Sequence, residues 1–257
     1  DGLKKMHLHS VSISINWSVH IEHENLLLAF CSTTKSGYRK EKNDNYFAFA
    51  SSINVSRNGL FLSVDFVFGL TRIWRIKYKD IYPSEIEQIS DFSWSSKPTS
   101  LISGTHFICA TRLETEVVIW EINGGTIHRI LKFGTLITAM AMDDEFGAIW
   151  ITTVNHGYYY SINGQRLAEI DFEKFDIKVT AMTAMPSNYA DRDRTVICGC
   201  DDGKVLIATS RIETRTIDVK ILPSKHSWKI NRITFHPNRT SFLTTDISGA
   251  VFIWSAG

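Results

Sequence analysis

The sequence predicts an all-β protein assembled from repeated four-stranded units. Three observations carry this prediction. Two apolar runs joined by a turn recur along the chain at intervals of 46, 40, 48 and 46 residues. The turns hold Gly, Asp, Asn or Ser, which is typical of β-hairpins. No segment keeps the apolar periodicity of a long amphipathic helix.

Five copies of this hairpin align on their second apolar run. The interval suits four short strands with their turns, and about 40–45 residues is the length of one blade of a β-propeller. One column of the alignment holds an aromatic residue in four copies and alanine in the other. The copies span residues 59–76, 105–122, 146–162, 193–210 and 239–256, and the column contains Trp74, Trp120, Tyr160, Ala208 and Trp254.

A glycine stands five positions before the column residue in three of the copies. A tight turn between neighbouring strands needs positive φ, which glycine adopts without steric cost. We therefore expect Gly69, Gly203 and Gly249 to close hairpin turns. After the column, Ile-Asn-Gly at 122–124 and at 162–164 leads into alternating apolar and polar residues, as expected of an outer strand.

The units are expected to stack around an axis, because stacking hides sheet edges and buries the faces that one unit alone would expose. Residues 53–257 contain the five recognisable units, and residues 1–52 are predicted to supply a degenerate blade or parts of two. About six or seven blades are therefore expected over residues 1–257. Because the chain begins at Asp1 rather than methionine, we expect it to be a fragment of a larger protein.

The composition excludes several classes of protein. Hydrophobic residues make up 44% of the 257, enough for a core, and the net charge of +1 gives no field to attract nucleic acid. Four scattered cysteines do not suggest a disulfide framework, so a reducing cytoplasmic setting is predicted. No apolar run approaches the ~20 residues of a transmembrane helix.

The last unit carries a recognisable family motif. The segment KHSWKINRITFHP (225–237) sets a histidine before an apolar strand, and Trp254 closes the following hairpin. This unit resembles a blade of the WD-repeat β-propeller family. The resemblance implies that His226 and Trp254 join a buried hydrogen-bond network with an Asp of the hairpin turn. It places Asp202 at that Asp position in the fourth unit, whereas the last unit has Ser248 there and Asp246 two residues earlier.

A narrower resemblance depends on the order of the units. The segments INVSRNGLFLSVDFVFGLTRIW (53–74), AMDDEFGAIWITTVNHGYYYSINGQRLAEI (141–170), VICGCDDGKVLIA (196–208) and RTSFLTTDISGAVFIW (239–254) follow one another. Together they look like the C-terminal propeller of BEACH-domain proteins, which are large cytosolic scaffolds linked to vesicle trafficking, lysosome-related organelles and autophagy. The PH-like and BEACH modules that precede the propeller in that family are not present in this sequence.

The sequence offers no convincing catalytic, cofactor or metal site. His7 and His9 would share one face of a strand, but no third ligand has a fitting spacing. Cys198 and Cys200 are interpreted as buried thiols of a strand. The acidic run from Asp143 to Glu145 is interpreted as a solvated turn. Nucleophile, phosphate-binding and zinc-protease motifs are lacking, as is the Phe-Arg-Arg-Gly signature of phosphoinositide-binding propellers.

The tryptophans outside the column are expected to lie mostly in the core rather than on a stacking surface for bases or sugars. These are Trp17, Trp94, Trp150 and Trp228. The polar segment at 33–45 is interpreted as a loop between strands, with the docking of acidic partners or lipids as the alternative.

Taken together, the sequence predicts a non-catalytic scaffold that binds proteins or peptides through propeller faces and loops. The BEACH resemblance implies a role in vesicle and membrane trafficking, with membranes contacted only through neighbouring modules or partners. The expected location is the cytoplasm, including the periphery of vesicle or endolysosomal membranes. Two alternatives remain: an interaction propeller of a ubiquitin ligase or RNA-processing assembly, and a propeller hydrolase with polar residues lining its channel.

Overall fold

The computed structural model describes residues 7–9, 18–20, 50–79, 82–186, 193–223, 225–235 and 241–255. Spatial contacts between residues divide the chain into two compact units, each discontinuous in sequence. The first comprises residues 1–113 and 120–126, and the second comprises residues 114–119 and 127–257. Most of the segment 1–52, including Trp17 and the loop at 33–45, lies outside the described residues. The side chains of His7 and His9 also lie outside them.

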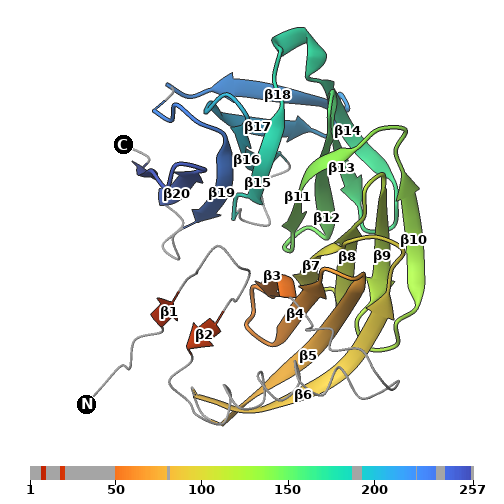
Figure 1. Cartoon of the computed structure of the whole chain (residues 1–257). Helices are drawn as coiled ribbons and strands as arrows, with labels where there is room; N and C mark the ends of the chain where they lie inside the picture. The colour runs from red at the N-terminus through yellow and green to blue at the C-terminus, as the bar shows by residue number, and fades with distance from the viewer. Residues whose placement is uncertain are drawn as a thin grey trace. The chain divides into compact units, whose positions relative to one another are not determined.

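The first unit contains an antiparallel sheet of four consecutive strands, drawn in orange to yellow in Figure 1. Its second strand is buried along its whole length, because the segment FLSVDF is mostly apolar and has a strand on each side. The strands are β3 (Ala50–Val55), β4 (Phe61–Phe66), β5 (Leu70–Lys79) and β6 (Tyr82–Ser93). The short strands β1 (His7–His9) and β2 (Ser18–His20) form a separate antiparallel pair.

The next sheet has the strand order β7-β8-β9-β10. Its strands are β7 (Thr99–Ser103), β8 (Ile108–Arg112), β9 (Glu116–Glu121) and β10 (Ile127–Lys132). The apolar run from Val117 to Trp120 in β9 is buried, whereas β10 is largely exposed, with Ile130 46% accessible. The strand that follows the first Ile-Asn-Gly is therefore an outer strand.

The second unit contains two further four-stranded antiparallel arrays and a three-stranded sheet (Figure 1). The first array consists of β11 (Ile137–Asp143), β12 (Ala148–Thr153), β13 (His156–Ser161) and β14 (Arg166–Asp171), followed by the helical turn η1 (Glu173–Phe175). The second consists of β15 (Val179–Ala184), β16 (Arg194–Cys200), β17 (Val205–Arg211) and β18 (Thr216–Ile221). The last sheet contains β19 (Ile230–Phe235), β20 (Ser241–Asp246) and β21 (Val251–Ser255).

Successive sheets of the second unit pack face to face. Their first strands β11, β15 and β19 lie beside one another. Trp150 and Tyr159 from the first array share a buried cluster with Leu206 and Ala208 from the second. A second cluster joins residues of β15, β16 and β17 to Ile230 of the last sheet. A single parallel pairing of Glu169 with Thr216 also links β14 to β18 at the outer edge.

The all-β prediction and the four-stranded antiparallel units are confirmed. In the four-stranded arrays the two middle strands are more buried than the last strand, as β12 and β16 show against β10 and β18. Among the described residues, no helix is long and apolar enough to cross a membrane.

Candidate functional site

A buried hydrogen-bond network holds the last sheet together. The Trp254 indole donates from Nε1 to Oγ1 of Thr244 at 2.8 Å. The same oxygen lies 2.7 Å from Nε2 of His226, whose Nδ1 lies 2.8 Å from Oδ2 of Asp246. His226, Thr244 and Asp246 are all less than 5% exposed. The network therefore ties the segment before β19 to β20 and β21.

The second oxygen of Asp246 fixes the β20–β21 turn. Oδ1 accepts hydrogen bonds from the Ser248 hydroxyl at 2.6 Å, from the Ser248 amide at 2.9 Å and from the Ala250 amide at 3.1 Å. The Ser248 hydroxyl, followed by His226 and the two amides, lowers the pKa of Asp246 to about 2 against the opposing effect of burial. A carboxylate with this many donors remains ionised at neutral pH.

The resemblance placed the network carboxylate at Asp202, and the structure corrects this position. Asp202 is exposed. Its carboxylate accepts the backbone amide of Lys204 at 3.0 Å and pairs with the ammonium group of Lys204. The buried carboxylate belongs to Asp246, three residues before Gly249, and Cys200 stands three residues before Gly203. Ser248 corresponds to Asp202 and supports Asp246 rather than replacing it. The network is thus complete in the last sheet, and β16 has a thiol at the corresponding position.

The three turn glycines share one backbone geometry. Gly69, Gly203 and Gly249 have φ values of 88°, 83° and 88°. Each donates its amide to the carbonyl three residues earlier, at 3.1, 3.3 and 3.1 Å respectively. At Gly203 a side chain would also overlap the carbonyl of His226, so the turn requires glycine both for its conformation and for this close approach.

The aligned column has different contacts in different sheets. Trp120 is fully buried and donates to Thr111 at 2.9 Å, in the way that Trp254 donates to Thr244. Trp74 is also buried. The column also contains Tyr160, which is half-buried against Phe133 with ring centroids 6.1 Å apart, and Ala208, which is 1% exposed in the cluster containing Trp150 and Tyr159.

The interpretation of residues 143–145 as a solvated turn was wrong for its first two members. Asp143 and Asp144 are 5% and 9% exposed. Asp143 Oδ2 accepts the Tyr159 hydroxyl at 2.9 Å and lies 4.0 Å from Nε of Arg194, whose side chain is 2% exposed. Burial, and then the Asp143 carboxylate, raise the pKa of Tyr159 well above its ordinary value. No local sequence pattern indicates this pairing, because Arg194 lies in β16 of the neighbouring four-stranded array.

A further buried carboxylate, Asp65 at 0% exposure, was not anticipated from the sequence. Its Oδ1 accepts the hydroxyls of Thr71 at 2.7 Å and of Ser100 at 2.6 Å. Ser100 lies 2.9 Å from the hydroxyl of Thr111, which also accepts the Trp120 indole. The sequence signal that could have indicated this network is the presence of Ser and Thr among the apolar residues of neighbouring strands. This network links β4, β5, β7 and β8 of the first unit through buried hydroxyl and carboxylate groups.

The network of the last sheet supports an exposed apolar and basic surface, which we call the Trp228 surface. It consists of Trp228, Ile247, Lys225 and Lys229. Trp228 and Ile247 are 58% and 59% exposed, and the Ile247 amide donates to the Lys229 carbonyl at 3.0 Å. Trp228 is thus an exception to the expectation that most of the tryptophans outside the column lie in the core, whereas Trp150 is buried. Both turns that carry this surface begin at buried network residues, His226 and Asp246, so its side chains project from a fixed frame.

No family model and no curated relative matches the chain. A solved chain from "Crystal Structure of Mitotic Checkpoint Complex" is similar to it, with a TM-score of 0.59 and 13% sequence identity. The match covers 86% of this chain and 79% of that one. The chain has a β-propeller-like fold. At this sequence identity the similarity extends to the fold alone.

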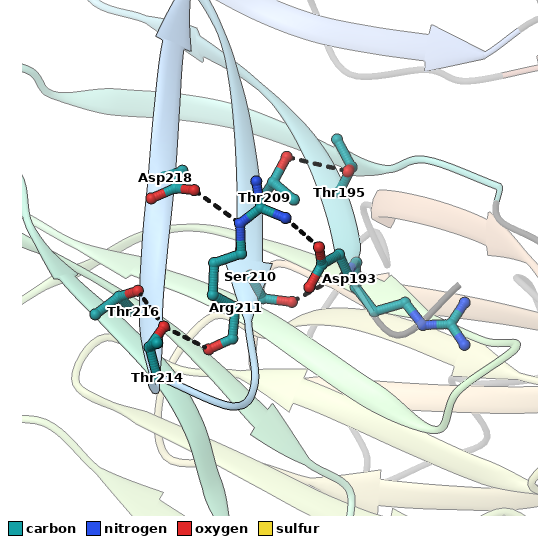
Figure 2. Close-up of polar contacts among 9 residues, drawn as sticks. Asp193, Thr195, Thr209, Ser210, Arg211, Thr214, Thr216 and Asp218 are labelled. Atoms are coloured by element: carbon teal, nitrogen blue, oxygen red, sulfur yellow. Dashed lines mark hydrogen bonds and ion pairs between the residues drawn. The ribbon is translucent and has the colours of Figure 1, made fainter. Parts of the chain in front are cut away.

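The polar end of the β15–β18 blade shows how the propeller-like sheets are stabilised at their surface. In Figure 2 the guanidinium of Arg211, at the end of β17, points toward two carboxylates. It donates to Asp218 at 2.8 Å and pairs with Asp193. The hydroxyls of Thr195 and Thr209 lie 3.2 Å apart. Exposed ion pairs contribute little to stability, so this cluster orders the blade end without forming a reactive site.

The described cysteines, Cys109, Cys198 and Cys200, are buried free thiols within the propeller-like sheets. Burial raises the pKa of each, to about 12 for Cys200. A protonated buried thiol is a poor nucleophile and a poor metal ligand. Within the described ranges, no group of three or more His, Cys, Asp and Glu side chains is placed to hold a metal ion.

Proposed function

We propose that this chain is a non-catalytic propeller that binds partner proteins. The observation that carries the proposal is the Trp228 surface, where two large apolar side chains are more than half exposed on turns anchored by a buried network. An exposed tryptophan held on a rigid frame is typical of protein interaction sites, because little conformational entropy is lost on binding.

The rival proposal, a propeller hydrolase, has less support. It requires acidic or histidine side chains converging on the first strands of several blades. The first strands ITAMAMD and VTAMTA present mostly small, apolar and hydroxyl side chains, and Asp143 at the end of β11 is buried against Tyr159 and Arg194. These features favour a binding function.

The experiment that tests the binding function is quantitative affinity purification with the full chain as bait. Trp228→Ala should lose a defined set of proteins that the wild type retains, while its thermal unfolding stays unchanged because the side chain is exposed. Phe175→Ala is the matched control, since Phe175 is 48% exposed elsewhere in the second unit. Identical protein sets on all three baits would contradict the proposal.

A more specific proposal concerns the cellular role of the protein. The order of the repeat units supports a BEACH-type scaffold that acts in vesicle and membrane trafficking, located in the cytoplasm and at the periphery of endolysosomal membranes. Sequencing the transcript upstream of Asp1 tests this directly. A reading frame that continues into PH-like and BEACH modules is the expected result, whereas an unrelated upstream module would leave only the interaction propeller.

A further inference from the structure

Two neighbouring turns of the first unit present apolar side chains to solvent. One turn joins β3 to β4 at residues 56–60, and the other joins β7 to β8 at residues 104–107. Leu60 and Phe107 are 41% and 46% exposed, and Tyr78, near the end of β5, is 43% exposed. Large apolar side chains gathered on a surface are typical of interaction sites. We call these three residues together with Arg75 the Phe107 surface.

The two turns are in direct contact and are held rigidly. Asn58 accepts the Ser56 hydroxyl at 2.7 Å and the Leu60 amide at 3.1 Å. A methyl group at Gly104 in the other turn would overlap the Asn58 side chain, so the turns are closely packed. The Tyr78 hydroxyl donates to the carbonyl of Gly59 at 2.9 Å. The turns that carry these apolar side chains are therefore fixed by hydrogen bonds and close packing before any partner binds.

Phe107 has an unusual backbone conformation. Its φ is +56°, in the left-handed region that bulky residues rarely adopt. The Ile122 amide donates to its carbonyl at 3.0 Å, and its ring meets Phe61 edge-on at 5.8 Å. A glycine would adopt this conformation without strain. A strained residue whose ring is nevertheless half exposed points to a role outside folding.

A guanidinium group borders these apolar residues. The guanidinium of Arg75 donates to the Asn123 amide oxygen at 3.0 Å and lies 5.8 Å from the centroid of the Phe61 ring. Across the ranges that the structure describes, no carboxylate forms an ion pair with Arg75. The Phe61 ring thus has both this positive charge and the Phe107 ring at 5.8 Å from its centroid.

We propose that the Phe107 surface binds a peptide segment of a partner protein in which a Leu, Phe or Trp stands beside an Asp or Glu. The apolar side chain packs against Leu60, Tyr78 and Phe107, and the carboxylate pairs with Arg75, whose planar guanidinium suits a carboxylate. This inference rests on the proposed function in taking the partner to be a protein. It uses different residues from the Trp228 surface, so the two can be tested separately.

The test selects binders from a random-peptide phage library on the full chain and then measures their affinities by fluorescence polarisation. The expected peptides carry an acidic residue next to Leu, Phe or Trp. Their affinity should fall at least about tenfold for Phe107→Gly and for Arg75→Gln. Phe68→Ala is the control, because Phe68 is 48% exposed in the turn at the other end of β4 and should leave the affinity unchanged.

A stability measurement separates binding from folding. Phe107→Gly should keep or raise the melting temperature, because glycine relieves the left-handed strain while the lost ring was half exposed. Loss of peptide binding with full stability is the expected combination. A lower melting temperature together with weaker binding would mean that Phe107 acts only in folding, and would overturn the proposal.

Other outcomes also decide against it. Selection of basic peptides, of no peptides, or of acidic-apolar peptides that bind all variants equally would overturn the inference. Binding to phosphatidylserine vesicles, lost in Phe107→Gly without any selected peptide, would assign the surface to a membrane instead. Loss of cellular partners in Trp228→Ala but not in Phe107→Gly would preserve the proposed function and reject this surface.

Discussion

Removing the hydroxyl of Thr244 tests the network that holds the last sheet. This single oxygen bonds to both the Trp254 indole and the His226 imidazole. Thr244→Val keeps the shape of the side chain and removes only the hydrogen-bonding atom. The His226 imidazole and the Trp254 indole would then each lose their hydrogen bond to residue 244.

The size of the effect follows from the burial of each partner. His226 is 4% exposed, so its Nε2 would become a buried unsatisfied group, which costs about 1–3 kcal/mol. Trp254 is only partly buried and can regain water, so its loss should be nearer 0.5–1.5 kcal/mol. The free energy of unfolding should therefore fall by roughly 2–4 kcal/mol, which corresponds to a melting temperature lower by on the order of 5–15 °C.

The assay is urea unfolding followed by tryptophan fluorescence and far-UV circular dichroism. Thr245→Val is the matched control, since Thr245 is the next residue of β20 and bonds at the surface to Asn231 at 2.8 Å. It should change stability by no more than about 0.5 kcal/mol. If Thr244→Val and Thr245→Val proved equally mild, the network would not hold the sheet together and the reasoning would fail.

Three further predictions follow from the same structure. Because the pKa of Asp246 is lowered by folding, its ionised carboxylate stabilises the fold above about pH 4, and this stabilisation is lost as the pH falls toward 2. Asp246→Asn should therefore lower the free energy of unfolding at pH 7 but weaken its dependence on pH in the acid range. Gly203→Ala should lower stability more than Gly249→Ala in thermal unfolding, because both glycines have positive φ, which costs alanine about 1–2 kcal/mol, but only Gly203 also meets a carbonyl. Arg194→Met should lower the free energy of unfolding by roughly 3–5 kcal/mol in chemical unfolding, because it leaves the buried Asp143 carboxylate without its cation. The double variant Arg194→Met, Asp143→Asn should recover part of that loss.

The strands and turns could be predicted because their causes are local. A hairpin needs apolar runs of strand length and a residue that tolerates positive φ, and both appear in the sequence as spacing. Gly69, Gly203 and Gly249 were identified in this way, and all three have the same φ and the same amide bond. The fold class follows from repeating such local units.

The polar networks could not be predicted because their partners are distant in sequence. Asp143 pairs with Arg194 of a neighbouring array, and Asp65 accepts a hydrogen bond from Ser100 of the next sheet. Alignment to a family pattern pointed to the turn position that Asp202 occupies in the fourth copy and Ser248 in the last. In the last sheet the buried carboxylate comes from Asp246, two residues earlier, and Ser248 donates to it. Burial also depends on what surrounds a turn, which is why the exposure of Trp228 could not be predicted.

The alanine of the aligned column has a consequence for how the repeats can diverge. Ala208 shares a buried cluster with Trp150 and Tyr159, whose stacked rings lie 4.5 Å apart and come from the preceding array. The volume that a tryptophan would fill in one blade is thus supplied by its neighbour. A mutation that enlarged position 208 would be accepted only after a mutation that shrank Trp150 or Tyr159. Adjacent repeats of this protein are therefore expected to evolve in pairs, each limiting the order in which the other can change.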